Sequence, residues 1–403
     1  MQATSPLQEK TKKYLCQTYA RYPLEIKSAR GCHLYDFNGR EYLDLLSGIS
    51  VCNLGHSHPR LISAITRQIE KLIHVSNLFY QEEQVNLAEK LTLTCSLDKV
   101  FFCNSGAEAN EGAIKLTRRY MQKIQNQNRF EIITLSGSFH GRTLATLTAT
   151  GQDKIKEGFD PLPPGFKTIP FNDENALEQA VSHETAAIMV EIIQGEGGIK
   201  ILSPGFMEKT AQLCRSHDLL LIVDEIQTGM GRTGKFWAHQ HYGLNPDIIT
   251  SAKAMANGLP MGAVMSTERV ARAFDPGSHG TTFGGGALTC AACLEVLEVM
   301  ERENLIEKAG QLGEKALEIF EQVRQNHPEK IREIRGKGLM LGIELDFQGG
   351  KIWKALLEQG FILNLTQETV LRLLPPLIIS REHIESFARV LDKLLHDPKL
   401  CRE

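Results

Sequence analysis

The sequence predicts an α/β fold: a large domain with a mostly parallel sheet, plus a smaller α+β domain. Between about residues 61 and 300, short apolar runs typical of buried strands alternate with segments of helical periodicity. Such alternation is typical of a parallel sheet covered by helices. After residue 304 the alternation stops. A chain of 403 residues, 42% of them apolar, is long enough for two domains.

The large domain is expected to extend over residues 56–300. Its strands are predicted from continuous apolar runs, because a strand buried on both faces shows no alternation. These strands are residues 99–103, 131–135, 186–193, 219–223 and 247–250. The helices between and after them are residues 108–121, 205–217 and 287–300.

The smaller domain is expected to extend over residues 301–403, and residues 1–55 are expected to join it. Its elements are one long amphipathic helix, two short strands and a final helix. They are predicted at residues 306–325, 338–345, 370–373 and 381–395.

The composition argues against several classes of protein. A formal net charge of −3 gives no basic field for nucleic acid. The apolar run 219–223 is far shorter than the roughly 20 residues that span a bilayer. Residues 1–14 carry charges and no following apolar core, so no secretory signal is expected and the location is predicted to be cytoplasmic.

Nine cysteines, an odd number scattered along a long chain, predict reduced thiols rather than a disulfide framework. Cys290 and Cys293 form a single CxxC pair on an expected helix, with no second pair nearby. Packing in the core is therefore favoured over redox or metal chemistry, and no metal site is expected.

Asp224 and Lys253 carry the strongest chemical signal. Asp224 ends one apolar run, and Lys253 follows the next run among small apolar residues. Burial would lower the pKa of the lysine and favour the neutral amine that attacks aldehydes. A lysine that forms a Schiff base and a carboxylate that keeps a ring nitrogen protonated are what pyridoxal phosphate requires. A helix cap and an ordinary surface lysine are the alternatives.

Ser105, Gly106 and Ala107 follow a predicted strand and begin a helix. Backbone N–H groups at the positive end of a helix bind phosphate, although a Ser-Gly helix cap is common without one. Phe139 and Arg142 follow another strand at the same sheet edge, where they could stack on a ring and grip a carboxylate. A core phenylalanine and a solvated arginine are the alternatives there.

Several motifs in this order resemble those of the class III aminotransferases of fold type I, over nearly the whole chain. They include Gly55-His56-Ser57-His58-Pro59, Asn104-Ser105-Gly106-Ala107-Glu108-Ala109, Phe139-His140-Gly141-Arg142, Gln194-Gly195-Glu196-Gly197-Gly198, Asp224-Glu225-Ile226-Gln227-Thr228-Gly229 and Leu371-Arg372-Leu373-Leu374-Pro375-Pro376. Each motif is moderately specific, and their joint order is highly specific.

The resemblance implies a role for each matching residue around the cofactor. Lys253 would be the Schiff-base lysine, and Asp224 the partner of the pyridine nitrogen. Gln227 would lie near the phenolic oxygen, with Phe139 and Ile226 on the two ring faces.

The resemblance also implies a homodimer with a shared active site. Ser105, Gly106 and Ala107 would hold the phosphate in one subunit, and Thr282 would reach the phosphate of the neighbouring subunit. Thr282 belongs to the glycine-rich segment 280–286, which is weak support by itself.

For the substrates, the resemblance implies that Arg142 binds the α-carboxylate. Glu196 and Arg372 would form an ion pair that opens when Arg372 receives the α-carboxylate of 2-oxoglutarate. Within the family, the resemblance implies transfer of the δ-amino group of N2-acetylornithine to 2-oxoglutarate, which would give N-acetylglutamate 5-semialdehyde and glutamate in arginine biosynthesis. Ile49 stands where ornithine δ-aminotransferases have tyrosine, which disfavours free ornithine.

Other ω-aminotransferases remain alternatives, with succinyl-diaminopimelate, 4-aminobutyrate or ornithine as substrate. A glutamate-1-semialdehyde aminomutase would need no external acceptor, and a noncatalytic relative would bind no cofactor. The chain departs from the family pattern at Ile192, where proline is common, and at Gly286-Ala287, where Asn-Pro is common.

Overall fold

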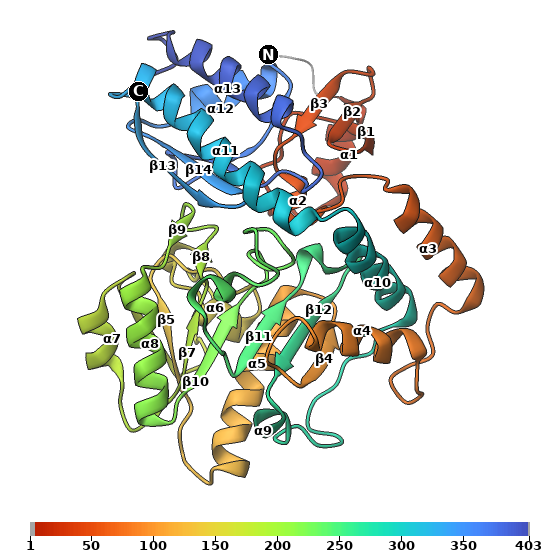
Figure 1. Ribbon diagram of the computed structural model, residues 1–403, viewed down its shortest axis with the longest axis vertical. Helices are drawn as coiled ribbons and strands as arrows, with labels where there is room; N and C mark the ends of the chain where they lie inside the picture. Colours follow the sequence, from red (N-terminus) through yellow and green to blue (C-terminus); the bar gives the residue numbers. More distant parts are fainter. Residues whose placement is uncertain (1–4, 402–403) are drawn as a thin grey trace.

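The computed structural model describes residues 5–401 (Figure 1). At its centre is a seven-stranded sheet with the order β4-β12-β11-β10-β7-β5-β6. Strand β12 runs antiparallel to both neighbours, and the other pairs are parallel. The strands are β4 Lys99–Cys103, β5 Glu131–Leu135, β6 Phe166–Ile169, β7 Thr185–Val190, β10 Leu220–Asp224, β11 Ile248–Ser251 and β12 Gly262–Ser266. The predicted fold class is confirmed.

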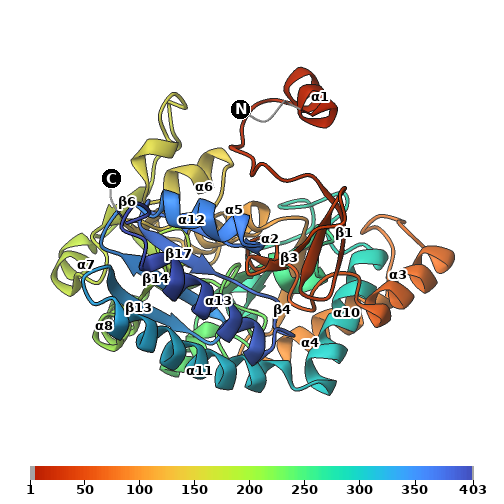
Figure 2. The same ribbon diagram turned by 90° about the horizontal axis from the view of Figure 1, so that it is seen from above.

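Both faces of this sheet are buried, which explains the continuous apolar runs. In β10, Leu221 and Val223 pack into one apolar cluster, and Leu220 and Ile222 pack into another on the opposite face. Helices cover the two faces (Figures 1 and 2). The helices of this part of the chain are α3 Pro59–Lys71, α4 Glu82–Thr92, α5 Gly106–Arg119, α6 Leu144–Ala149, α7 Glu174–Ala180, α8 Pro204–His217, α9 Glu268–Ala271 and α10 Ala287–Arg302. Helix α3 packs mainly on α10.

One predicted strand is wrong in its length. The run 186–193 does not form a single strand, because β7 ends at Val190. Ile193–Gln194 instead forms β8, which pairs with β9 Lys200–Ile201 outside the large sheet. The apolar run continues because Ile192 and Ile193 are buried in the core cluster beside β7. Burial alone therefore does not mark the end of a strand.

The chain after residue 304 forms a second sheet with the order β13-β14-β17-β16. Its strands are β13 Ile331–Lys337, β14 Met340–Leu345, β16 Asn364–Thr366 and β17 Val370–Leu373. The helices that accompany it are α11 Leu305–Asn326, α12 Gly350–Glu358 and α13 Arg381–Leu395. Strand β13 was not predicted, because four of its seven residues are charged and leave no apolar run.

The N-terminal strands form a third sheet that includes a strand from the C-terminal part of the chain. Strand β15 (Phe361–Ile362) pairs in parallel with β3 (Glu41–Asp44). On its other side β3 pairs with β2 (His33–Asp36), which in turn pairs with β1 (Ile26–Arg30). The helices of this part are α1 Pro6–Tyr14 and α2 Ser47–Ser50. Domain boundaries after residues 55 and 300 remain predictions.

Cys290 and Cys293 are fully buried in the main core cluster on α10. Burial raises the pKa of the Cys290 thiol to about 12 and that of Cys293 well above its usual value, so both thiols stay protonated. Just before them, Gly286 caps α10 and Ala287 is its first residue. Within residues 5–401, no helix is both long and apolar enough to cross a membrane.

Candidate active site

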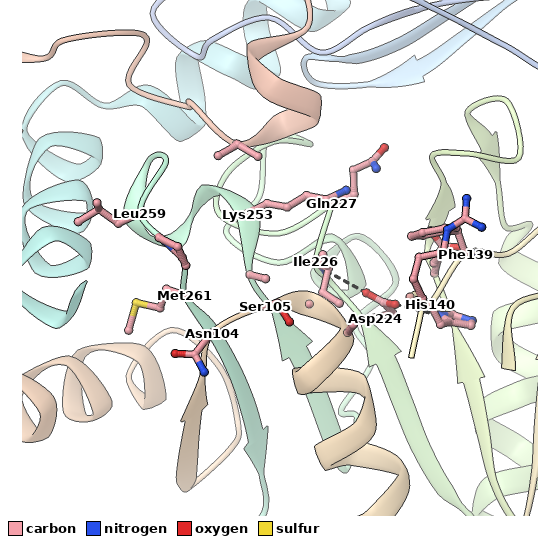
Figure 3. A pocket seen from close by; sticks show the side chains of 18 of the residues that line it. Asn104, Ser105, Phe139, His140, Asp224, Ile226, Gln227, Lys253, Leu259 and Met261 are labelled. Atoms are coloured by element: carbon pink, nitrogen blue, oxygen red, sulfur yellow. Dashed lines mark hydrogen bonds and ion pairs between the residues drawn. The ribbon is translucent and has the colours of Figure 1, made fainter. Parts of the chain in front are cut away.

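A cavity of about 400 Å³ lies at the carboxyl ends of β10 and β11 (Figure 3). Ligands bind at this edge in open α/β sheets. Asp224 on β10 lies opposite Thr250 on β11. Lys253 lies three residues after Thr250. Nine of the predicted site residues line this cavity: Ser105, Gly106, Ala107, Phe139, Arg142, Asp224, Ile226, Gln227 and Lys253.

The Asp224 carboxylate is buried and accepts three hydrogen bonds. Asn110 Nδ2 and His140 Nδ1 both contact Oδ2 at 2.8 Å, and the backbone N–H of Ile226 donates to Oδ1 at 3.0 Å. Three donors suit an ionised carboxylate, which can only accept. Such a group would hold a protonated pyridine nitrogen in place.

Asn110 and His140 are site residues whose role the sequence did not reveal. Asn110 also donates to the backbone carbonyl of His140, and Thr250 Oγ1 donates to Asn110 Oδ1 at 2.7 Å. Burial lowers the pKa of His140, but the hydrogen bond and charge of Asp224 outweigh this effect and raise the pKa overall. His140 therefore holds the Asp224 carboxylate in place.

Glu191 is a third residue that sequence reasoning missed. It lines the cavity directly after β7, and its Oε2 accepts the backbone N–H of Phe139 at 2.9 Å. Burial raises the pKa of its carboxyl, with the charges of His140 and Lys253 acting in the opposite direction. An acidic residue at the end of an apolar strand is the same signal that identified Asp224.

Lys253 begins the 3₁₀ turn η4 (Lys253–Ala256) in a left-handed conformation, with φ of 44°. Residues other than glycine rarely adopt this backbone conformation, and backbone strain of this kind clusters at functional sites. Its Nζ has no hydrogen-bond or ion-pair partner within residues 5–401. Desolvation lowers the pKa of Lys253 to about 8, although the charge of Glu196 opposes the shift. The site therefore brings this pKa close to physiological pH, where part of the lysine is the neutral amine.

The first turn of α5 faces the same cavity. Ser105 caps this helix, with its Oγ accepting the N–H of Glu108 at 3.2 Å, so the helix-cap alternative also holds. The N–H groups of Gly106 and Ala107 have no partner inside the helix. A Cβ at Gly106 would approach the Ile226 side chain to 2.9 Å, so glycine is needed there. A phosphate would find backbone donors and a positive helix end here.

The ion pair between Glu196 and Arg372 is formed, beside the cavity rather than in its wall. Arg372 Nη1 contacts Glu196 Oε1 at 2.7 Å, and Nη2 donates to Asn364 Oδ1 at 2.7 Å. Gln227 connects the pair to the cavity, because its Oε1 lies 3.4 Å from Arg372 Nη1. Arg372 Nε is buried and has no partner among the described residues, which leaves one donor for a carboxylate.

Arg142 and Thr282 occupy more exposed positions. The Arg142 guanidinium lies 5.6 Å from the centre of the Phe139 ring, and its side chain is exposed at the cavity. Thr282 is exposed and does not line the cavity of its own chain. Ile49 does not line it either and packs against the core with φ of 66°, whereas Val51 does line it.

Fold and site together define a pyridoxal-phosphate enzyme. A lysine with a lowered pKa, a buried carboxylate and a helix N-terminus with free donors surround one cavity. Residues 14–395 match the family model "Aminotransferase class-III", and the chain belongs to this family. The predicted family and cofactor are confirmed, since class-III aminotransferases use pyridoxal 5′-phosphate.

Similar proteins are matched over nearly their full length. Acetylornithine aminotransferase from Methanocaldococcus jannaschii is 48% identical, over 96% of this chain and 97% of that protein. The protein of the same name from Aquifex aeolicus is 44% identical, over 95% of this chain and 100% of that protein. Ornithine aminotransferase from Toxoplasma gondii ME49 is a structural match with a TM-score of 0.92 and 34% identity, covering 97% of this chain and 94% of that chain.

The lowered pKa of Lys253 predicts how fast the cofactor-free protein takes up pyridoxal phosphate. The neutral amine is the reactive form, so the rate should rise about tenfold per pH unit below pH 8 and level off above it. Stopped-flow absorbance at pH 6 to 10 measures this rate. A rate that keeps rising to pH 10 would mean that the lysine keeps its ordinary pKa.

Proposed function

We propose that the enzyme transfers the δ-amino group of N2-acetylornithine to 2-oxoglutarate, giving N-acetylglutamate 5-semialdehyde and glutamate in arginine biosynthesis. The observation that carries this proposal is the full-length similarity to acetylornithine aminotransferases, at 48%, 47% and 46% identity in three organisms. A binding module without catalysis would not need the Lys253 and Asp224 arrangement.

Each residue of the site has a defined task in this proposal. Pyridoxal phosphate, when bound, accepts the amino group and withdraws electrons from the substrate carbon. Lys253 would hold the cofactor aldehyde and, once displaced by the substrate amine, move a proton from the substrate δ-carbon to the cofactor side. Asp224, held by Asn110 and His140, would keep the ring nitrogen protonated.

The phosphate would be bound by the first turn of α5, and the ring would lie between Phe139 and Ile226. Gln227 would reach the phenolic oxygen from its place beside Arg372. Gly195 leaves room for Gln227, because a Cβ there would come within 1.8 Å of Gln227 Oε1. Arg142 would bind the α-carboxylate of acetylornithine.

The Glu196–Arg372 pair would let one pocket accept two differently charged substrates. While the pair is closed, Glu196 neutralises Arg372, and its own pKa is held below the usual value by Arg372 in spite of burial. When Glu196 moves away, Arg372 keeps its hydrogen bond to Asn364 and presents a cation to 2-oxoglutarate. A carboxylate can form two parallel hydrogen bonds with a guanidinium.

Replacing Arg372 by methionine should raise the KM for 2-oxoglutarate about 10²-fold or more, since hydrogen bonds to charged groups contribute about 1.5–3 kcal/mol each. The half-reaction with acetylornithine should change much less. Single-turnover kinetics of each half-reaction measure the two effects separately, with Arg332→Met, at an exposed position of β13, as the matched control. Equal losses in both half-reactions would contradict the switch.

We also infer that the active site is completed by a second copy of this chain. Leu78, Phe79, Tyr80 and Phe283 form an exposed apolar patch next to Thr282. The two segments are joined, because Asn77 Nδ2 donates to the Gly284 carbonyl at 3.0 Å and the His74 and Phe283 rings lie 5.5 Å apart. Exposed patches of this kind mark interaction sites. Thr282 would then contact the neighbour's phosphate.

The kcat/KM values for four amino donors with 2-oxoglutarate as acceptor test the proposed substrate. N2-acetylornithine should exceed ornithine, 4-aminobutyrate and succinyl-diaminopimelate. A higher kcat/KM for ornithine than for N2-acetylornithine would favour ornithine aminotransferase activity, which is the name of the structural match from Toxoplasma gondii. Turnover without 2-oxoglutarate would favour an aminomutase instead.

A further inference from the structure

The carboxyl ends of helices α11 and α13 bring together two histidines and one aspartate. His327 follows the last residue of α11, and His396 follows the last residue of α13. Asp392 lies one turn before His396 on the same helix face. Helices α11 and α13 pack side by side in both views (Figures 1 and 2).

One ligand atom from each of the three residues lies within 4.8 Å of the other two. His327 Nε2 is 3.2 Å from Asp392 Oδ1, and His396 Nε2 is 4.0 Å from Asp392 Oδ2. The His327 and His396 rings meet edge to face, with centroids 4.5 Å apart. His327 is buried, so one nitrogen ligand is already fixed.

The electrostatic surroundings favour a cation at this point. The carboxyl end of a helix carries a partial negative charge, and two such ends meet here beside the Asp392 carboxylate. Lys330 lies in the same region, but its Nζ is held by the Leu395 carbonyl at 2.8 Å. Glu329 lies beside Lys330, with 3.6 Å between their charged atoms.

We propose that His327, Asp392 and His396 bind a divalent transition metal of the zinc type, at a site separate from the cofactor cavity. Two imidazole nitrogens and one carboxylate oxygen are a ligand set that Zn²⁺ accepts, with water in the fourth position. Asn326 Nδ2 donates to Asp392 Oδ1 at 2.9 Å, which is an outer contact of the kind that orients metal ligands.

Binding requires only a small movement of one exposed side chain. Zinc ligands at about 2.1 Å from the metal lie about 3.4 Å from one another in a tetrahedron. The His396 side chain is 68% exposed and can close the remaining gap. The metal would then connect the ends of α11 and α13 and stabilise the folded state in proportion to its occupancy.

Calorimetric titration of the chelator-treated, cofactor-loaded enzyme with Zn²⁺ alone tests the site. We expect one Zn²⁺ per chain and a melting temperature that rises with Zn²⁺ concentration. Mg²⁺ and Ca²⁺, which prefer oxygen ligands, should produce neither effect. Absence of binding, or a site of equal affinity for Mg²⁺, would overturn the proposal.

Two variants that should fold locate the binding. His396→Ala and Asp392→Asn should each weaken Zn²⁺ binding by at least about 100-fold, more than the loss of an outer contact. His183→Ala, an exposed histidine elsewhere, and Asp397→Asn, which removes a neighbouring charge without removing a ligand, should leave the Kd unchanged. If His396→Ala and His183→Ala bind Zn²⁺ equally well, the metal binds at a different place.

Discussion

Replacing Lys253 by alanine is expected to lower the turnover number about 10⁴-fold, the upper end of what general acid–base catalysis contributes. In the proposed mechanism the variant loses both the amine that would hold the cofactor and the base that would act on the substrate carbon. The helix N-terminus and Asp224 remain, so some cofactor should still bind without a covalent link. Glutamate formation from 2-oxoglutarate measures turnover, and cofactor retained after dialysis measures binding.

Lys354→Ala is a suitable control, because this lysine is exposed on α12. It should leave both quantities unchanged. Normal turnover in Lys253→Ala would contradict the assignment of this lysine as the catalytic group.

Replacing Asp224 by asparagine is expected to lower turnover about 10³-fold, the effect typical of removing one preorganised electrostatic group from a site. The amide has no charge for a protonated ring nitrogen. One of its two polar atoms is also a donor. In one orientation of the amide it faces Asn110 and His140, and in the other it faces the backbone N–H of Ile226, so a donor meets a donor either way. The cofactor absorbance should change together with turnover, because the protonation of the ring changes.

Asp153→Asn, at a fully exposed position, removes the same charge from the surface and should have no effect. An Asp224→Asn variant with unchanged turnover and absorbance would show that the carboxylate does not face the ring nitrogen.

The sequence predicted the centre of the site because parallel strands end at the same edge of a sheet. Asp224 and Lys253 each follow an apolar run, so their proximity could be inferred from the pattern. Ser105 and Phe139 follow two other strands in the same way. The strand order alone places residues that follow these strands at one edge of the sheet.

The sequence did not reveal Glu191 and Asn110 as site residues, for two different physical reasons. Glu191 was hidden because the apolar run 186–193 was predicted to be one strand, whereas β7 ends just before this residue. Asn110 lies inside helix α5, where its sequence neighbours give no sign of Asp224. Its role depends on how α5 packs against β10 and β11, and this is a tertiary feature without a local signal.

Thr282 illustrates a different limit. Its proposed partner is a phosphate in another subunit, so a single chain contains no contact from which the role could be read. The ion pair of Glu196 and Arg372 was predicted only from the resemblance to the family. Its residues come from a loop and from β17 of a different sheet.

The most direct test is the visible absorbance of the cofactor-loaded protein during separate additions of N2-acetylornithine, ornithine and 4-aminobutyrate without 2-oxoglutarate. We expect the yellow band to disappear at the lowest concentration with N2-acetylornithine and to return when 2-oxoglutarate is added. A band lost first with another amine would contradict the proposed substrate. A protein with no such band after incubation with pyridoxal phosphate would contradict the role of Lys253.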